Sequence, residues 1–146
     1  MLSGGIPMVY VKDDGVFDEP LDKIWKYIQD PEDHVHQAIL SQKVLEQKGN
    51  TMKLRVETLN ARGSKEEQIW KMTMDPPFGH ELEVLEGSTR GTKQTHVYVP
   101  MGNKTKVIVV GDYKMPGADD ETIRKGALEN LARVFDEDSR QLHAFK

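Results

Sequence analysis

The sequence PGADDETIRKGALENLARVFDEDSRQLHAFK, residues 116–146, decides the fold. Its apolar residues recur at steps of three, four and seven, the period of one face of an α-helix: Ile123, Ala127, Leu128, Leu131, Val134, Phe135, Leu142 and Phe145. We expect a helix from about Ala118 to Phe145, capped by Asp119 or Asp120. The apolar stripe of so long a helix needs a sheet against which it can be buried.

The segments before this helix supply the strands of such a sheet. Strand character starts at Met8 and resumes at Val16 after a turn-like Lys12-Asp13-Asp14-Gly15, so the first strand is predicted to be split or bulged. Six consecutive strands are predicted further on, separated by turn residues, in the ranges 44–48, 52–56, 69–74, 80–86, 93–99 and 105–113. Strands joined by short turns imply an antiparallel sheet and an α+β fold.

Two short helices are predicted between the first strand and the next. Asp18 or Glu19 can cap the first, Pro20 suits its first turn, and one apolar face runs to about Gln29 through Leu21, Ile24, Trp25 and Ile28. Asp30-Pro31 repeats the cap-and-proline signal. A second stripe then extends to about Ser41 through Val35, His36, Ile39 and Leu40.

The composition indicates one globular domain, which we expect over residues 8–146 with a loose terminus at residues 1–7. The net charge is −4 and the basic residues are scattered among acidic ones, so nucleic acid is not an expected partner. The absence of Cys fits a reducing compartment. Without a signal peptide or an apolar run of ~20 residues, we expect a cytoplasmic protein with no integral membrane segment.

The order of these elements carries a family resemblance. Together with Val16-Phe17-Asp18-Glu19-Pro20-Leu21-Asp22-Lys23-Ile24-Trp25 and Asp30-Pro31, it resembles the helix-grip (SRPBCC) superfamily of START domains, the birch pollen allergen, polyketide cyclases and coenzyme Q-binding proteins. The resemblance implies a curved seven-stranded antiparallel sheet around the long C-terminal helix, with two short helices closing one end of an apolar cavity. Most members bind hydrophobic molecules, a minority are enzymes, and some only contact other proteins.

Apolar and aromatic residues supply candidates for the wall of that cavity. Trp70, Met72 and Met74 alternate along one strand, and Trp25, Tyr98 and Phe135 can join them. Met gives an adaptable apolar wall, and Trp or Tyr adds one polar atom. Taken singly, each of these residues can equally be packed core; as a group, within this fold, some are expected to border the cavity.

Polar candidates are fewer. Asp138 follows Val134 and Phe135 by four and three residues, near the inward face of the helix, where it can bind a ligand or act as a general base; alternatively the helix has passed the sheet and Asp138 is solvated. His36 and His96 are either ligand contacts or half-exposed structural residues. The histidine spacings do not fit a metal site. The opposite face of the helix is predicted to be solvated: Arg124, Lys125, Glu129, Arg133, Glu137 and Arg140.

Three functions remain open from these residues. The first is a binding or carrier protein without a cofactor for a lipid, sterol, polyketide or quinone-like molecule, held by the ten residues Trp25, His36, Trp70, Met72, Met74, His96, Tyr98, Val134, Phe135 and Asp138. The second is a cyclase- or hydrolase-like enzyme in which Asp138 or a His transfers a proton. The third is a protein-interaction domain of the chaperone-activator kind.

Overall fold

The computed structural model describes residues 8–30, 36, 38–59 and 63–145. In chain order these residues form β1 (Val9–Phe17), α1 (Leu21–Ile28), β2 (Ile39–Lys48), β3 (Thr51–Leu59), β4 (Lys65–Asp75), β5 (Gly79–Glu86), β6 (Lys93–Met101), β7 (Lys104–Tyr113) and α2 (Asp120–Ala144). Of the predicted order of a strand, two short helices, six strands and a long helix, the strands, the first short helix and the long helix are confirmed.

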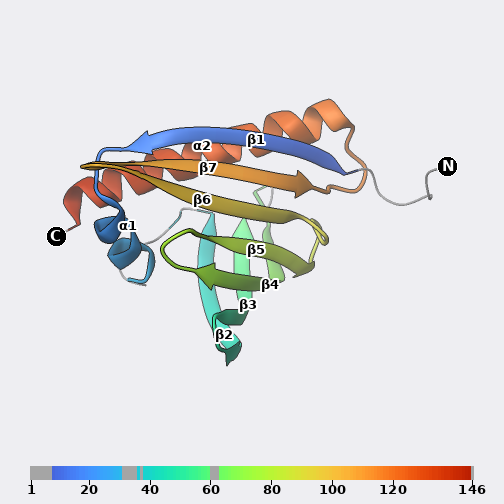
Figure 1. Cartoon of the computed structure of the whole chain (residues 1–146). Helices are drawn as coiled ribbons and strands as arrows, with labels where there is room; N and C mark the ends of the chain where they lie inside the picture. The colour runs from blue at the N-terminus through green and yellow to red at the C-terminus, as the bar shows by residue number, and fades with distance from the viewer. Residues whose placement is uncertain (1–7, 31–35, 37, 60–62, 146) are drawn as a thin grey trace.

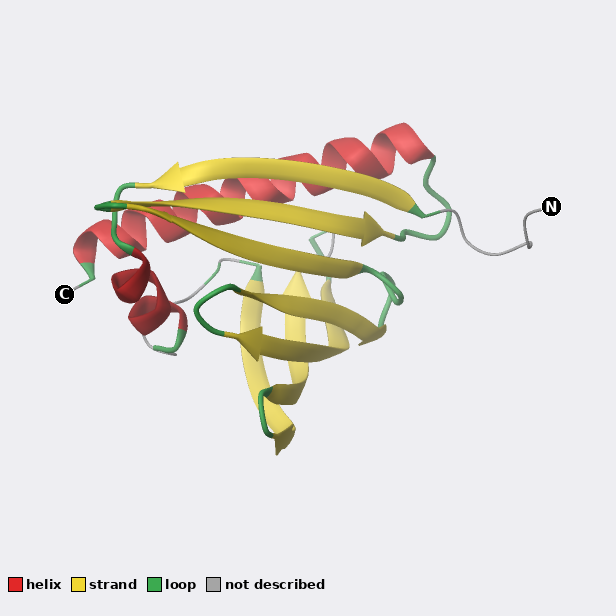
Figure 2. Ribbon diagram, in the orientation of Figure 1, coloured by secondary structure: helices red, strands yellow, loops and turns green. Residues whose placement is uncertain are grey.

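The strands form one antiparallel sheet in the order β1-β7-β6-β5-β4-β3-β2, with β1 and β2 at its edges. The sheet curves strongly, so that β2 and β3 run across the direction of β1 and β7 (Figure 1). The long helix α2 lies along β1 and β7, and α1 packs near the C-terminal end of α2 (Figure 2). The predicted α+β helix-grip architecture is confirmed.

Helix α2 begins as its sequence predicts. The carboxylate of Asp119 accepts a hydrogen bond from the backbone N–H of Thr122 at 2.8 Å, which caps the helix and lowers the pKa of Asp119. The predicted stripe supplies most of its buried face, including Ile123, Ala127, Leu131 and Leu142. The amphipathic pattern therefore identifies most of the buried face of this helix, except that Leu128 of the stripe is 36% exposed.

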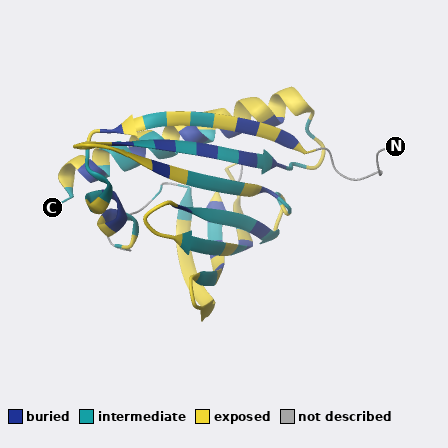
Figure 3. Cartoon of the chain, viewed as in Figure 1, coloured by how far each residue is buried: buried dark blue, intermediate teal, exposed yellow. Residues whose placement is uncertain are grey.

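The main core lies between α2, α1 and the strands β1, β6 and β7. Strand β7 shows the alternation most clearly, because its inward residues are buried at every second position (Figure 3). The core cluster consists of Val9, Val11, Phe17, Ile24, Trp25, Tyr27, Tyr98, Val107, Val109, Tyr113, Ile123, Ala127, Leu131 and Leu142. This core occupies one end of the sheet, whereas β2 to β5 extend beyond it.

Strand β1 is continuous, so the predicted split at Lys12-Asp13-Asp14-Gly15 is wrong. Its register with β7 runs without a shift from Val9 opposite Tyr113 to Phe17 opposite Thr105. Gly15 has a different role, since a Cβ atom there would lie 2.6 Å from the ring of Phe135. That ring stacks on Phe17 with centroids 4.7 Å apart. The glycine thus permits close approach of α2 rather than a turn.

The cap predicted for α1 is also wrong. Pro20 holds the N-cap position without a side-chain hydrogen bond, and its carbonyl accepts from the backbone N–H groups of Lys23 and Ile24. The Glu19 carboxylate instead pairs with Lys23 Nζ at 3.1 Å, and the Glu19 carbonyl accepts from Thr105 Oγ1 at 2.9 Å. The start of the helix is therefore fixed by its neighbours in the sheet.

The second short helix falls largely on residues 31–35 and 37, which lie outside the described residues. Its predicted C-terminal part is wrong, because Ile39 to Ser41 belong to β2. A bulge between Ile39 and Ser41 interrupts the pairing with β3, and a second lies between Val44 and Glu46. Each bulge breaks the two-residue alternation, so the sequence of this strand lacks the pattern that identifies β4 or β7.

Candidate functional site

The sheet register brings Trp70, Met72 and Met74 onto one face. Trp70 lies opposite Leu54 and Val84, Met72 lies opposite Leu82, and Met74 lies opposite His80. Residues directly opposite each other share a face, so this row continues through β5 and β6 to Tyr98 and then Val107. Val107 and Tyr98 belong to the core under α2. The row therefore faces the same side of the sheet as α2, and Trp70, Met72 and Met74 in it are half-buried.

The two indole N–H groups are bound within the protein. Trp25 Nε1 donates to the carbonyl of Pro77 at 3.0 Å, and Trp70 Nε1 donates to Gln68 Oε1 at 2.7 Å. Sequence reasoning assigned each Trp one polar atom for a ligand. Because those atoms already have partners, the indoles offer apolar ring surface instead.

A chain of hydrogen bonds holds Trp70 in place. Gln68 Nε2 donates to Glu66 Oε2 at 2.6 Å, and Glu66 also accepts from the backbone N–H and the hydroxyl of Ser88. Burial alone would raise the pKa of Glu66, but the hydrogen bonds from Gln68 and Ser88 together lower it. The indole is thus anchored through Gln68 to an ionised carboxylate.

A second group of side chains lies where β5 and β6 meet α1. His80 Nε2 is 3.0 Å from the hydroxyl of Tyr98, the rings of His80 and His96 stack with centroids 4.4 Å apart, and Trp25 meets Tyr98 edge-on. Burial, and secondly the negative charge of Asp138, raises the pKa of Tyr98 well above its usual range. Tyr98 is therefore a neutral phenol throughout the physiological pH range.

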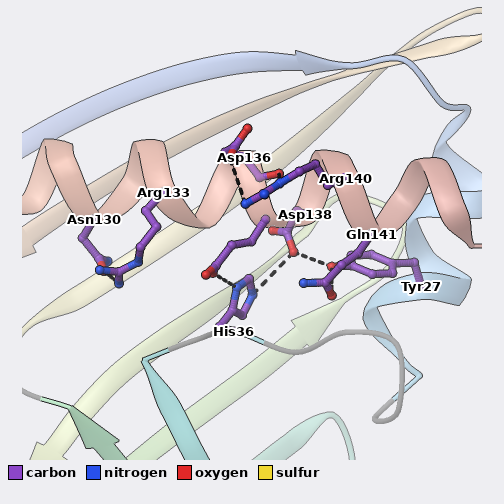
Figure 4. A network of polar contacts seen from close by, with 9 residues as sticks. Tyr27, His36, Asn130, Arg133, Asp136, Asp138, Arg140 and Gln141 are labelled. Atoms are coloured by element: carbon purple, nitrogen blue, oxygen red, sulfur yellow. Dashed lines mark hydrogen bonds and ion pairs between the residues drawn. The ribbon is translucent and has the colours of Figure 1, made fainter.

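Asp138 belongs to a polar cluster on α2 (Figure 4). Its Oδ1 accepts a hydrogen bond from the hydroxyl of Tyr27 at 2.7 Å, and that hydroxyl is also 3.0 Å from Gln141 Oε1. His36 lies between two carboxylates, with Nδ1 2.8 Å from Glu137 Oε1 and Nε2 3.4 Å from Asp138 Oδ1. A neutral imidazole has one N–H, so donating to both carboxylates at once requires the doubly protonated ring.

This geometry places Asp138 inward, with a side chain 17% exposed, rather than in open solvent. It contradicts the prediction for Glu137, which was assigned to the solvated face but is 8% exposed. Adjacent helical residues point about 100° apart, so Glu137 lies outside the apolar stripe and is buried beside His36. No periodic signal in α2 identifies such a residue, because its partner comes from a distant segment.

Sequence reasoning also missed Tyr27, His80 and Gln141. Tyr27 is 1% exposed and follows Ile24 by three residues, so its spacing on α1 was a usable signal. His80 shares the face of Leu82, and it was detectable by alternation once β5 was assigned. Gln141 follows Val134 by seven residues and Asp138 by three, so its spacing on α2 was also a usable signal.

The ten candidate residues do not form a single surface. Phe135 packs on Phe17 at the β1 side, Val134 is half-buried on α2, and Trp25 and Tyr98 belong to the core. His96, Trp70, Met72 and Met74 lie on the sheet, whereas Asp138 contacts His36 at α2. The structure thus provides an apolar row on the sheet and a polar cluster on the helix, joined electrostatically through Asp138 and Tyr98.

Within the described ranges, no three side chains of His, Asp or Glu are grouped so that they could hold a metal ion. No helix formed by those residues is both long enough and apolar enough to cross a membrane.

Comparison with known proteins identifies the fold. No protein-family model matches the sequence, and no curated protein matches it. Among solved structures, the chain is similar to a START superfamily protein from Mycobacterium smegmatis, with a TM-score of 0.82. The identity is 14%, and the match covers 94% of this chain and 99% of that one.

Two other neighbours extend the comparison. The Zhui aromatase/cyclase from Streptomyces sp. R1128 matches with a TM-score of 0.74 and 13% identity, over 93% of this chain and 92% of that one. Ara h 8.0201 matches with a TM-score of 0.74 and 11% identity, over 94% and 99%. The chain therefore has the helix-grip fold, and the resemblance to START domains, the pollen allergen type and the cyclases is confirmed at the level of fold.

Proposed function

We propose that the protein binds or carries a small hydrophobic molecule between α2 and the face of β4, β5 and β6 that is turned toward it. The observation that carries this proposal is the half-buried apolar row of Trp70, Met72, Met74 and Leu82. The row shares a face with the main core, yet only Met74 packs against that core. A ligand seated on these side chains would complete their burial.

Apolar contact supplies most of the binding energy in this proposal. Covering about 200 Å² of apolar protein surface is worth roughly 5 kcal/mol before the entropic cost of association. The bound N–H groups of Trp25 and Trp70 favour an apolar ligand, because neither indole seeks a polar partner. Orientation falls to His96, Tyr98 and Asp138, near the junction of the row with the polar cluster.

The ligand class we propose is a lipid, sterol, polyketide or quinone-like molecule, bound without a cofactor. Solved structures of the same fold include START and aromatase/cyclase proteins, which supports a hydrophobic ligand by analogy of fold. We also propose a cytoplasmic location, consistent with the absence of Cys. Val134 and Phe135 remain proposed wall residues on the α2 side.

An environment-sensitive apolar dye tests the proposal directly. The wild-type protein should enhance the dye's fluorescence, and fatty acids, sterols or polycyclic phenols should displace it. Met72→Glu places a charge in the apolar row and should weaken dye binding at least about tenfold. Lys71→Glu is the matched control, since Lys71 is exposed at the adjacent position on the opposite face. Equal dye binding by both variants would contradict the proposed site.

A second candidate function is a cyclase- or hydrolase-like enzyme using the same site. The placement of His36 between Glu137 and Asp138 favours it, because such a group can move a proton, and the charge of Asp138 also acts on the neutral phenol of Tyr98. Mass spectrometry of small molecules extracted from wild-type and Asp138→Asn protein separates the two functions. A carrier yields the same species from both proteins. An enzyme yields an unconverted species from the variant alone.

A protein-interaction domain with a vestigial cavity is the remaining possibility. It predicts that the dye is not displaced by any member of the ligand panel. Under that outcome the half-buried row would be a loosely packed part of the core.

A further inference from the structure

The outer edge of β2 is an exposed strand at the end of the sheet. Residues 40–48 are exposed on both faces of β2, because α2 packs against β1 and β7 at the other end (Figure 3). The exposed side chains include apolar Leu40, Val44 and Leu45, and Val44 is 51% exposed. Among the strands that the described residues form, β2 pairs with β3 alone, so its other side is open to a further strand. Such an edge is a pairing site for another chain.

We propose that this edge binds a second copy of the same chain, with the two β2 strands antiparallel about a two-fold axis between Val44 and Leu45. Successive pairs in that register have residue numbers that add to 89. Val44 then lies opposite Leu45 of the second copy, Lys43 opposite Glu46, and Gln42 opposite Gln47. The symmetry repeats each pair.

Charge complementarity selects the second copy as the occupant. Lys43 and Glu46 are both exposed, and the two-fold register sets opposite charges against each other twice. The apolar pairs of Val44 and Leu45 lie between these charged pairs and become buried on pairing. The strand is therefore complementary to itself in both charge and hydrophobicity.

The bulges of β2 are consistent with an edge that pairs with a particular strand rather than with any exposed strand. The bulge between Val44 and Glu46 leaves Leu45 without a Cα partner on β3, and Lys43 and Lys48 lie along the strand. Bulges and lysines weaken pairing with arbitrary strands. A carboxylate opposite Lys43 offsets part of this weakening, and Glu46 of a second β2 strand supplies that carboxylate.

The opposite edge of the sheet lacks these properties. On β1, Asp13 is turned inward on the face of Val109, and Asp14 follows it. Two-fold pairing of β1 that joins Lys12 to Asp14 would set Asp13 against Asp13 of the second copy. Inward charges and like-charge pairs oppose edge association. The inference is therefore specific to β2.

A charge-reversal cycle tests the interface, with self-association measured by sedimentation equilibrium over a concentration series. The wild-type chain should be in a concentration-dependent monomer–dimer equilibrium. Lys43→Glu or Glu46→Lys alone should raise the dissociation constant about tenfold, because like charges then meet twice. The double variant should restore dimerisation. Lys71→Glu, an equal charge change on the interior strand β4, should leave the dissociation constant unchanged.

Far-ultraviolet circular dichroism checks that each variant is folded, as expected for exposed positions. A wild-type chain that stays monomeric at every concentration would overturn the proposal, even if the β2 edge binds a strand of a different protein. A dimer insensitive to both single reversals would place the interface elsewhere and overturn it equally. Neither result bears on ligand binding, which is assigned to another part of the sheet.

Discussion

The hydroxyl of Tyr27 on α1 lies 2.7 Å from Oδ1 of Asp138 on α2, joining residues 111 positions apart in the sequence. Tyr27 is also edge-on to the ring of Phe145, beyond the end of α2. A single buried aromatic residue therefore fixes α1 against both the polar and the apolar sides of the C-terminal helix. The polar cluster depends on this contact for its geometry.

Tyr27→Phe tests the contribution of that hydroxyl. The substitution keeps the ring but removes the hydrogen bonds to Asp138 and Gln141, and a bond to a charged group is worth about 1.5–3 kcal/mol. We expect the free energy of unfolding to fall by about that amount in denaturant titration. Asp138→Asn should cost a similar amount, since it removes the charged acceptor.

Asp136→Asn is the matched control for Asp138→Asn. Asp136 lies two residues earlier on α2 and pairs with Arg140 at 2.9 Å, but both side chains are mostly exposed. Exposed ion pairs contribute little, so the free energy of unfolding should change by less than about 0.5 kcal/mol. Equal effects of the two substitutions would show that the Tyr27 contact is unimportant.

Two glycine-to-alanine substitutions should have opposite effects on stability. Gly15→Ala forces the Phe135 ring away from β1, and we expect a loss of about 1–3 kcal/mol. Gly126→Ala, on the exposed side of α2 with no atom near its Cβ, should stabilise the protein by about 0.5–1 kcal/mol. Thermal and denaturant unfolding measure both. Stabilisation by Gly15→Ala would mean that Phe135 does not confine this position.

Alkaline pH should destabilise the fold through Tyr98 and Tyr113. Burial, and secondly Asp13, raises the pKa of Tyr113 to about 12, and the pKa of Tyr98 is also raised. Unfolded tyrosine ionises near pH 10, so above about pH 10 the native state keeps protons that the unfolded chain releases. The free energy of unfolding should therefore be constant with respect to these groups below pH 10 and fall above it.

The ultraviolet absorbance of phenolate shows whether Tyr113 contributes to this loss of stability at alkaline pH. Titration of the wild-type protein should show an ionisation near pH 12 that is absent from Tyr113→Phe. The variant should also lose stability less steeply between about pH 10 and pH 12. An unchanged titration curve would contradict the assignment to Tyr113.

The fold was predictable where a clean period was present. Helix α2 and strand β7 repeat apolar residues at about 3.6 and 2 positions, and most of their buried residues follow those patterns. Prediction failed where an irregularity broke the period. Because bulges interrupt the alternation in β2, Ile39 and Leu40 were predicted to be helical although they belong to that strand. Gly15 suggested a turn, although it accommodates the Phe135 ring from α2.

The candidate site was predictable only in part, for a related reason. Asp138 and the row of Trp70, Met72 and Met74 could be assigned to a face from spacing within one element. The burial of Glu137 depends on His36, 101 residues away, and the occupation of the Trp70 N–H depends on the Gln68 amide. Contacts between distant segments leave no period in a single sequence.

Native mass spectrometry of the protein purified from its own cells, compared with the same sample after denaturing extraction, tests the central claim most directly. The account predicts a bound hydrophobic species that is released on unfolding and is lost from folded Met72→Glu but retained by Lys71→Glu. A mass equal to that of the polypeptide alone, with no rise in melting temperature across a lipid and polyketide panel, would contradict a hydrophobic carrier.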